Sequence, residues 1–461
     1  MIDLPLNVTR FRDVTDRLRA GYWFLPMLMA VGAVAGALII ISLDQTYFGQ
    51  SMVQLTPQSV LDTKSFRELA QLVATSTLAF IGVIFSIMLV PLSIAATQLG
   101  PPVLRTFMRN TGTQLVLGLF IGNAFFALTM LAAVPENELY PPALSSITLL
   151  GLFMASVAAL VYFINEVARS LQASTVINRL SRELEGDIER ELPQRPDTAT
   201  DYAACEAQRA DILAHGTAIH THHEGYIRAI DYGGLVKLGS QHHTTLATHY
   251  EPGDFVMRGD VLVRVTASTP VDGAFVDQVN RQFIMGNYRT ITQDVDFGLM
   301  ALVSVAVRAL SPAINDPYTA GMCVQRLGAA LAIIAARGEN IHHLRDAQGV
   351  LRVLGEPDSF HEHADLCFHQ IRQYGRTNTE VMIGLLRAIE RVSERTSHEE
   401  QRHTLRLHAD LIDRDARAGA LTDYDITRVR LQYDQTIATL DRMTEMVKGE
   451  GGPGSVTGRS D

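Results

Sequence analysis

The sequence has few cysteines and no cysteine pair. Its three cysteines, Cys205, Cys323 and Cys367, lie far apart, and no two of them form a CxxC motif. Small secreted domains depend on several cysteines that pair as disulfides, and such bonds persist only in oxidising compartments. The sequence therefore does not predict a disulfide framework, and it fits a reducing compartment.

Charged residues are also scarce, and no excess of positive charge is present. Asp, Glu, Lys and Arg make up 19% of the 461 residues, hydrophobic residues make up 47%, and the net charge is -10. Non-specific nucleic-acid binding needs a basic face, so we expect no nucleic-acid partner. The mean hydropathy is positive, which is unusual for a soluble protein and indicates that part of the chain lies in lipid.

The motifs of the common enzyme classes are missing as well. The tripeptide Asp296-Phe297-Gly298 resembles the kinase magnesium motif, but no glycine-rich loop, HRD or VAIK motif accompanies it. Ten of the fifteen histidines fall in two groups, at 215–249 and 361–369, but neither HExxH nor paired cysteines accompany them. We therefore predict no catalytic residue, no metal site and no cofactor, although a site built from distant residues leaves no such motif.

Long apolar runs are what the chain has in abundance. A helix needs about twenty apolar residues to cross the hydrocarbon core, and four runs in the first third are long enough. A fifth run, from Tyr318 to Ala336, is nearly as long but carries Gln325 and Arg326 in its middle, which is costly in lipid. The sequence predicts that this fifth run is a buried helix of a soluble domain and that four runs span the membrane: Tyr22–Leu43, Leu69–Ala96, Leu115–Val134 and Leu144–Ile164.

The positions of the arginines predict the orientation of these spans. Arginines precede the first run, lie between the second and third, and follow the fourth, whereas the loop after the third run carries Glu136 and Glu138 but no Lys or Arg. Positive residues stay on the cytoplasmic side. We therefore expect an inner-membrane protein with both termini in the cytoplasm.

The spans contain small and hydroxyl-bearing residues but no deeply placed charge. GxxxG pairs allow helices to approach closely, and they indicate either an oligomer or ordinary packing within one bundle. Hydroxyls on the second span either line a wet path or bond to their own backbone. The absence of deep Asp, Glu, Lys or Arg disfavours an ion-coupled carrier and favours a passive pore or an anchor. The packing candidates are Gly32, Gly36, Gly118 and Gly122, and the pore-lining candidates are Ser86, Ser93 and Thr97.

The composition predicts several further parts after the membrane domain of residues 1–165. Residues 166–200 continue the fourth span as a helical stalk and a linker. Residues 201–285 alternate apolar and polar positions between glycines and prolines, which is typical of a small β-rich unit. The pattern P-G-D-x-V-x-x-G-D-x-L at residues 252–262 resembles the second half of the biotinyl, lipoyl and efflux-adaptor barrels, so a barrel-like unit is expected. The nearby Lys237 does not lie on the hairpin that carriers modify. Residues 286–447 should be a helical cytoplasmic domain, and 448–461 a disordered tail.

Polar residues gather between two apolar segments in A-L-S-P-A-I-N-D-P-Y-T-A, residues 309–320. Pro312 ends one helix, and Asp316 followed by Pro317 begins the next. Part of the stretch therefore serves only to end one helix and start another. The remaining polar residues of the region are candidates for binding a small anion or another ligand near a helix N-terminus. The candidates are Arg289, Thr290, Gln293, Asp294, Arg308, Ser311, Asn315, Asp316 and Thr319.

Several of these motifs together resemble a large family of predicted bacterial inner-membrane proteins of unknown function. The matching segments are Q-L-G-P-P-V-L-R-T-F-M-R-N, T-Q-L-V-L-G-L-F, G-Y-I-R-A-I-D, P-G-D-F-V, R-T-I-T-Q-D-V-D-F-G and A-L-S-P-A-I-N-D-P-Y-T-A. Pro102 departs from the arginine that members often have at this place. The resemblance implies a membrane domain followed by a cytoplasmic domain, and it carries no catalytic residue.

The fold class that follows is an α-helical transmembrane domain joined to an α+β cytoplasmic domain. The leading functional hypothesis is a homo-oligomeric passive channel for ions or small solutes that the cytoplasmic domain regulates. The alternative is a membrane-anchored ligand sensor or scaffold without transport activity, and an enzyme ranks third.

Overall fold

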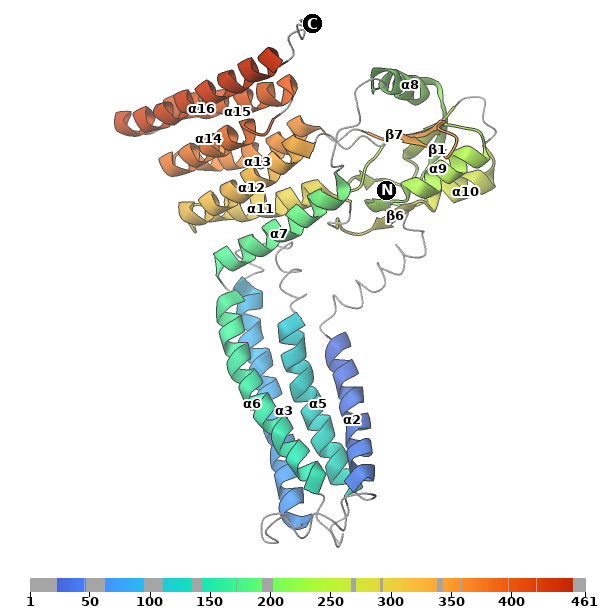
Figure 1. The fold of residues 1–461 in the computed structure, drawn as a ribbon, viewed down its shortest axis with the longest axis vertical. Coiled ribbons are helices and arrows are strands. Elements are labelled where there is room, and N and C mark those ends of the chain that lie inside the picture. Colours follow the sequence, from blue (N-terminus) through green and yellow to red (C-terminus); the bar gives the residue numbers. More distant parts are fainter. Residues whose placement is uncertain are drawn as a thin grey trace, which may run out of the picture. The chain divides into compact units, whose positions relative to one another are not determined.

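The computed structural model describes residues 23–44, 46, 63–94, 111–134, 143–170, 172–192, 202–266, 271–290, 293–337, 343–356, 359–396, 398–419 and 421–450. Their main elements are helices and two β-sheets (Figure 1). The described residues form two compact units, an N-terminal unit that ends at Val176 and a C-terminal unit that begins at Ile177. The predicted pore residue Thr97 lies outside the described residues.

The N-terminal unit is a bundle of four apolar helices (Figure 1). The third of them, α5, packs against each of the other three and is the most buried. The outward faces carry large apolar side chains such as Met27, Leu72, Leu89 and Val161. Such faces are costly in water and favourable in hydrocarbon. The helices are α2 (Phe24–Leu43), α3 (Thr63–Ile94), α5 (Thr111–Ala133) and α6 (Ala143–Ser170).

Two charged side chains bind backbone groups at the ends of these helices that have no partner within the helix. The Asp44 carboxylate accepts hydrogen bonds from the backbone amides of Leu144 and Ser145, at 2.9 and 2.8 Å, at the start of α6. Arg67 donates to the carbonyl of Leu131, at 3.1 Å, at the end of α5. Helix ends leave amides and carbonyls unsatisfied, and each charge has the sign that the helix dipole favours.

The strands of the C-terminal unit form two separate sheets. The five-stranded sheet has the order β1-β5-β3-β8-β7 and the three-stranded sheet the order β4-β2-β6. All pairs are antiparallel except β3 and β8. The strands are β1 (Thr217–His220), β2 (Gly225–Ile230), β3 (Leu246–Thr248), β4 (Phe255–Val256), β5 (Val261–Val265), β6 (Phe283–Gly286), β7 (His343–Arg345) and β8 (Leu351–Leu354).

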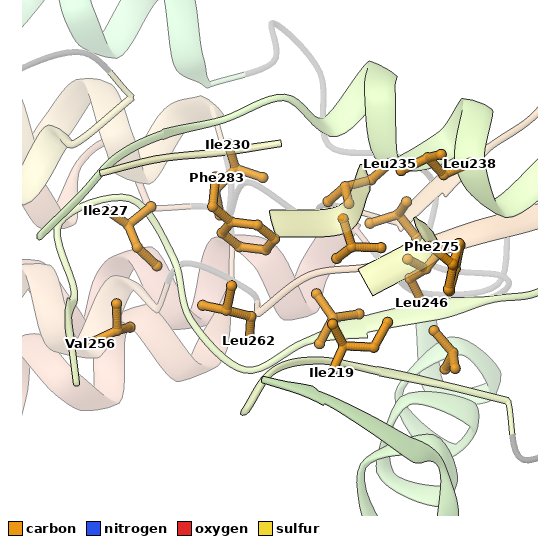
Figure 2. Close-up of a cluster of buried hydrophobic side chains, with 14 residues drawn as sticks. Ile219, Ile227, Ile230, Leu235, Leu238, Leu246, Val256, Leu262, Phe275 and Phe283 are labelled. Atoms are coloured by element: carbon orange, nitrogen blue, oxygen red, sulfur yellow. The ribbon is translucent and has the colours of Figure 1, made fainter. Parts of the chain in front are cut away.

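The predicted barrel-like unit is not confirmed, because these strands do not close into a barrel within the described residues. Strands β7 and β8 come from the segment that the sequence predicted to be helical. They are the last two strands at one edge of the five-stranded sheet. The core between the sheets collects apolar side chains from both, for example Ile219 and Leu262 from one and Ile227 and Phe283 from the other (Figure 2). Three helices flank these strands: α8 (Tyr202–His215), α9 (Tyr232–Gln241) and α10 (Gly273–Asn280).

The remaining helices of the C-terminal unit pack side by side (Figure 1). Helix α12 contacts α11, α13 and α14, and α14 contacts α15 and α16. Gly328 allows α12 to approach α14, because a Cβ there would lie 3.0 Å from that of Ala388. These helices are α11 (Val295–Ala309), α12 (Pro317–Arg337), α13 (Phe360–Gly375), α14 (Thr379–Ser393), α15 (Glu399–Ala418) and α16 (Asp423–Glu450).

Helix α7 (Ala173–Glu191) takes the place of the predicted continuous stalk. It begins after α6 has ended at Ser170, and its apolar stripe is buried within the C-terminal unit. Leu184 fills the space beside Gly298, where an added Cβ would come within 2.8 Å of it. Arg337 of α12 donates to the carbonyls of Glu189 and Leu192 at 3.1 and 3.0 Å. The amphipathic pattern of this segment therefore reflects packing on other helices.

Among the described residues, five helices are long and apolar enough to cross a membrane: α2, α3, α5, α6 and α12. Length and composition alone do not separate the predicted four spans from α12. Their surroundings differ, because α12 packs inside the C-terminal unit.

Candidate functional site

An ion pair lies at the start of α11. Asp294 precedes the helix and accepts a hydrogen bond from the amide of Phe297 at 2.9 Å, as an N-cap residue does. Arg289 donates from Nε and from a terminal nitrogen to the two carboxylate oxygens of Asp294, both at 2.8 Å. Although burial opposes its charge, these bonds raise the pKa of Arg289 above its ordinary value. Because both carboxylate oxygens accept a hydrogen bond, the bidentate geometry fixes the orientation of the two side chains in addition to the attraction between their charges.

The Pro252-Gly253-Asp254 turn of the β-rich part lies directly against this ion pair. Gly253 has a φ of +107°, and a Cβ at this position would lie 2.6 Å from an oxygen of Asp294 and 2.7 Å from a nitrogen of Arg289. Glycine is therefore needed both for its backbone conformation and for its lack of a side chain. The structure thus brings the P-G-D and R-T-I-T-Q-D motifs together.

Two more polar residues of the candidate set lie in the same region. Gln293 has a φ of +58°, and its side-chain oxygen accepts a hydrogen bond from the amide of Ile230, at the end of β2, at 2.9 Å. The hydroxyl of Thr290 is buried and has no hydrogen-bond partner among the described residues. Gln293 therefore connects the start of α11 to a strand.

A second carboxylate at the start of α11 binds a histidine. Asp296 lies 2.7 Å from Nδ1 of His363, a buried residue of α13. Burial alone would raise the pKa of Asp296, but the interaction with His363 holds it below its ordinary value. Neither His363 nor Gly253 was predicted to belong to this site. Their contacts join residues more than thirty positions apart. The sequence signal was therefore limited to the P-G-D-F-V motif around Gly253 and the histidine group around His363.

The other candidates lie at the far end of α11. That helix has fifteen residues, so its ends are about 20 Å apart at a rise of 1.5 Å per residue. Arg308 is half-buried in its last turn, where a cation is favoured by the helix dipole. The carboxylates at the start of α11 have contacts of their own there, since Asp294 binds Arg289 and Asp296 binds His363. The nine candidates therefore do not surround one ligand.

The stretch from Ser311 to Thr319 forms the expected turn between two helices. Asp316 accepts hydrogen bonds from the amide and the hydroxyl of Thr319, at 3.1 and 2.6 Å, and so caps α12. The hydroxyl bond lowers the pKa of Asp316. Asn315 has a φ of +48°, which asparagine tolerates better than most residues. The turn also exposes Tyr318, at 78% of its maximum.

The predicted pore residues that can be placed lie on the outer surface of the bundle. Ser86 and Ser93 of α3 are both exposed. The hydroxyl of Ser86 donates to the carbonyl of Gly82 at 3.1 Å, which is the backbone bond that the sequence offered as the alternative to a wet path. Its oxygen keeps the capacity to accept a further bond.

The glycines of the two GxxxG pairs have different surroundings. A Cβ at Gly118 would lie 2.4 Å from the sulfur of Met29 and 3.3 Å from Cα of Pro26, so α2 packs closely on α5 there. Gly122 faces the same helix at 3.4 Å from the carbonyl oxygen of Met29. Around Gly32 and Gly36 of α2, no neighbouring atom of the described part of the chain lies within 4 Å of an added Cβ. One pair therefore packs within the chain, and the other faces open space.

The histidine groups do not assemble into a metal centre in the part of the chain that the structure describes. No three His, Cys, Asp or Glu side chains lie together there in a way that could hold a metal ion. His222 instead pairs with Asp277 at 3.4 Å, and His343 with Glu206 at 3.2 Å.

Comparisons with known proteins agree with the motifs. A family model described as "Predicted membrane protein (DUF2254)" matches residues 19–391 and so confirms the resemblance. The protein is similar to "Uncharacterized protein Rv1290c" of Mycobacterium tuberculosis (strain ATCC 25618 / H37Rv), with 27% identity over 454 residues. The same identity and length relate it to "Uncharacterized protein Mb1321c" of Mycobacterium bovis. Each match covers 96% of this chain and 84% of the relative. No solved structure matches the chain.

Proposed function

Because the chain belongs to the DUF2254 family of predicted membrane proteins, we propose that it is a multi-pass inner-membrane protein that forms a passive pathway for ions or small solutes. Several copies assemble around the pathway, and the C-terminal unit regulates it from the cytoplasm. Helices α2, α3, α5 and α6 are the four spans, and α12 remains outside the membrane. The proposal includes no catalytic step.

The observation that carries this proposal is a stripe of small and hydroxyl-bearing residues on the exposed face of α3. The stripe members follow one another at spacings of three, four or seven residues, which places them along one line of the helix. Larger apolar residues such as Leu72, Phe85 and Leu89 flank the stripe. A helix that faces only lipid gains nothing from a stripe of small and hydroxyl-bearing residues, whereas a helix that contacts water or another copy of the chain does. The exposed stripe consists of Thr75, Ala79, Gly82, Ser86 and Ser93.

The assignment of α12 to the soluble unit rests on what its surface exposes. Among the described residues, α2 exposes five large apolar side chains between Met27 and Ile39, whereas α12 exposes only Tyr318. Its other large apolar residues pack against α11, α13 and α14. Arg326 also donates to the side chain of Asn178, at 2.6 Å, which favours an aqueous or protein environment over lipid.

Flux measurements on reconstituted protein test the pathway. Full-length protein in liposomes should carry ions or small solutes faster than protein-free liposomes do. Ser86→Leu places a branched apolar side chain on the stripe and should reduce the flux to the protein-free rate. Phe85→Trp is the matched control, because it adds bulk on the neighbouring residue, about 100° round the helix, and should leave the flux unchanged. Wild-type protein without flux over a range of solutes, voltages and pH values would contradict the pathway.

A membrane-anchored sensor is the second candidate, and the junction at the start of α11 favours it. There the Arg289–Asp294 pair, the Gly253 turn and the Asp296–His363 pair join the β-rich and helical parts of the C-terminal unit. A ligand that changes these contacts would alter how the two parts fit together. Hydrogen exchange at α11, measured with and without small anions on full-length protein, should show ligand-dependent protection if this candidate is right, with no flux in the liposome assay.

A further inference from the structure

The side of the five-stranded sheet that α8 covers contains a buried arginine. Cys205 and Ile212 of α8 pack with Ala247 of β3 and Leu354 of β8 in one apolar cluster. Arg209 lies between these two α8 residues at helical spacing, so its side chain is on the side of α8 that faces the sheet. It is only 12% exposed, and it donates to the carbonyl of Thr248 at 3.4 Å.

A second arginine and a histidine project from the same side of the sheet. Arg264 of β5 is the direct partner of Ala247, and residues that pair in this way lie on one side of an antiparallel sheet. His249 follows Ala247 by two residues and therefore lies on that side too. Its amide donates to the carbonyl of Leu262 at 3.0 Å, which continues the ladder. Three basic side chains therefore lie close together where α8 packs on the sheet: one from α8, one from β5 and one from the residue after β3.

These three side chains have nitrogen atoms that form no hydrogen bond with the described part of the chain. Nε of Arg209, Nε of Arg264 and Nε2 of His249 are buried without a hydrogen-bond partner there. A buried donor without an acceptor destabilises the fold, because it has lost its hydrogen bonds to water without gaining others. Burial lowers the pKa of His249, and the nearby charges of Arg264 and Arg209 lower it further. An acceptor with negative charge would relieve both the missing bonds and the repulsion between like charges.

The nearby carboxylates do not supply this acceptor. Glu356 lies 3.5 Å from a terminal nitrogen of Arg209, on the side that is open to solvent, and is 48% exposed. Glu206 pairs with His343 at 3.2 Å. Arg264 donates from a terminal nitrogen to the carbonyl of Gly216 at 2.8 Å, which leaves its Nε available.

We propose that Arg209, His249 and Arg264 form a binding site for a phosphate group of a small molecule. A phosphate offers several strong acceptor oxygens in a tetrahedral arrangement, and planar guanidinium groups bind such oxygens with matched geometry. Inorganic phosphate, a nucleotide and a lipid headgroup share this chemistry. The site is independent of the pathway proposed for the membrane helices, because it is built from the C-terminal unit alone.

Isothermal titration of full-length protein in detergent with inorganic phosphate, at constant chloride, tests the site. Wild-type protein should bind phosphate saturably. Arg264→Gln should weaken binding at least about tenfold, because it removes both a positive charge and charge-assisted hydrogen bonds to the phosphate. Arg258→Gln removes the same charge from an exposed position in the turn before β5 and should bind like the wild type.

Arg209→Gln provides an independent variant from a different element, so the test does not depend on the folding of one mutant. Titrations with adenosine monophosphate and with a short-chain phosphatidic acid then identify the kind of molecule that carries the phosphate. Tighter binding of adenosine monophosphate than of inorganic phosphate indicates a nucleotide, and tighter binding of phosphatidic acid indicates a lipid headgroup. Folded wild-type protein that binds none of the three overturns the proposal. Equal affinities of wild type, Arg264→Gln and Arg209→Gln for phosphate overturn it as well.

Discussion

Two constraints require glycine at position 253: its backbone conformation and the lack of space for a side chain. Its φ of +107° disfavours any L side chain, and an added Cβ would also meet the Arg289–Asp294 pair. Gly259 in the same part of the chain has a φ of +95° but open space around an added Cβ. The difference between alanine variants at the two positions therefore measures the contact with the ion pair.

We expect Gly253→Ala to destabilise the C-terminal unit by about 1–3 kcal/mol more than Gly259→Ala does. Thermal unfolding of the two full-length variants in the same detergent provides the comparison. Equal melting temperatures for the two variants would show that the turn does not press against the ion pair.

His408 makes the stability of the C-terminal unit depend on pH. Burial lowers its pKa from 6.5 to about 4, although Asp365, 3.2 Å away, partly offsets the effect. The unfolded chain therefore binds this proton at a higher pH than the folded chain does. Stability is fully present above about pH 6.5 and is lost as the pH falls towards 4, by about 3 kcal/mol for this group alone.

Unfolding midpoints measured between pH 7 and pH 4.5 should fall steeply for the wild type and less steeply for His408→Leu. The exposed His398→Gln variant serves as control and should follow the wild type. Parallel curves for wild type and His408→Leu would assign the acid sensitivity to other groups.

At the scale of elements, the turn between α11 and α12 depends on the cap at Asp316. Removing an N-cap costs about 1 kcal/mol. Asp316→Ala should therefore lower the stability of the C-terminal unit by that amount, because the bonds to Thr319 are lost. Asn315→Gly should be neutral or slightly stabilising, since its φ is +48°. Chemical unfolding followed by circular dichroism measures both variants.

The two GxxxG pairs should respond differently to a large side chain. Gly118→Ile would push α2 away from α5 and destabilise the N-terminal unit, because Met29 and Pro26 fill the space. Gly32→Ile should leave the fold of one chain intact, since nothing lies near it, but should weaken association if this face joins copies. Melting temperature and native mass spectrometry measure the two effects. An unchanged oligomer in Gly32→Ile would remove the first pair from the interface.

The whole molecule is expected to have a single orientation in the inner membrane. A cysteine at Glu138, in the loop without Lys or Arg, should react with an impermeant maleimide on intact cells. A cysteine at Arg258, exposed in the C-terminal unit, should react only after permeabilisation. Labelling of Arg258→Cys on intact cells would reverse the predicted orientation.

Composition and periodicity were enough to predict where the long apolar helices of the N-terminal unit lie. Apolar runs long enough for spans are a local property, so α2, α3, α5 and α6 were expected close to where they lie. The stop at Leu310 and the start at Asp316 were equally local, because proline and capping residues act within a few positions. The motifs also identified the family correctly, since they are contiguous in sequence.

Only the tertiary structure decided which distant segments meet. It brought β7 and β8 into the sheet, placed Gly253 against Arg289 and Asp294, and joined Asp296 to His363. It also placed Arg308 at the opposite end of α11 from Asp294, about 20 Å along the helix. Local patterns determine where helices and turns form, because they depend on neighbouring residues. Pairings across tens of residues depend on how whole surfaces fit together, and no window of sequence contains that information.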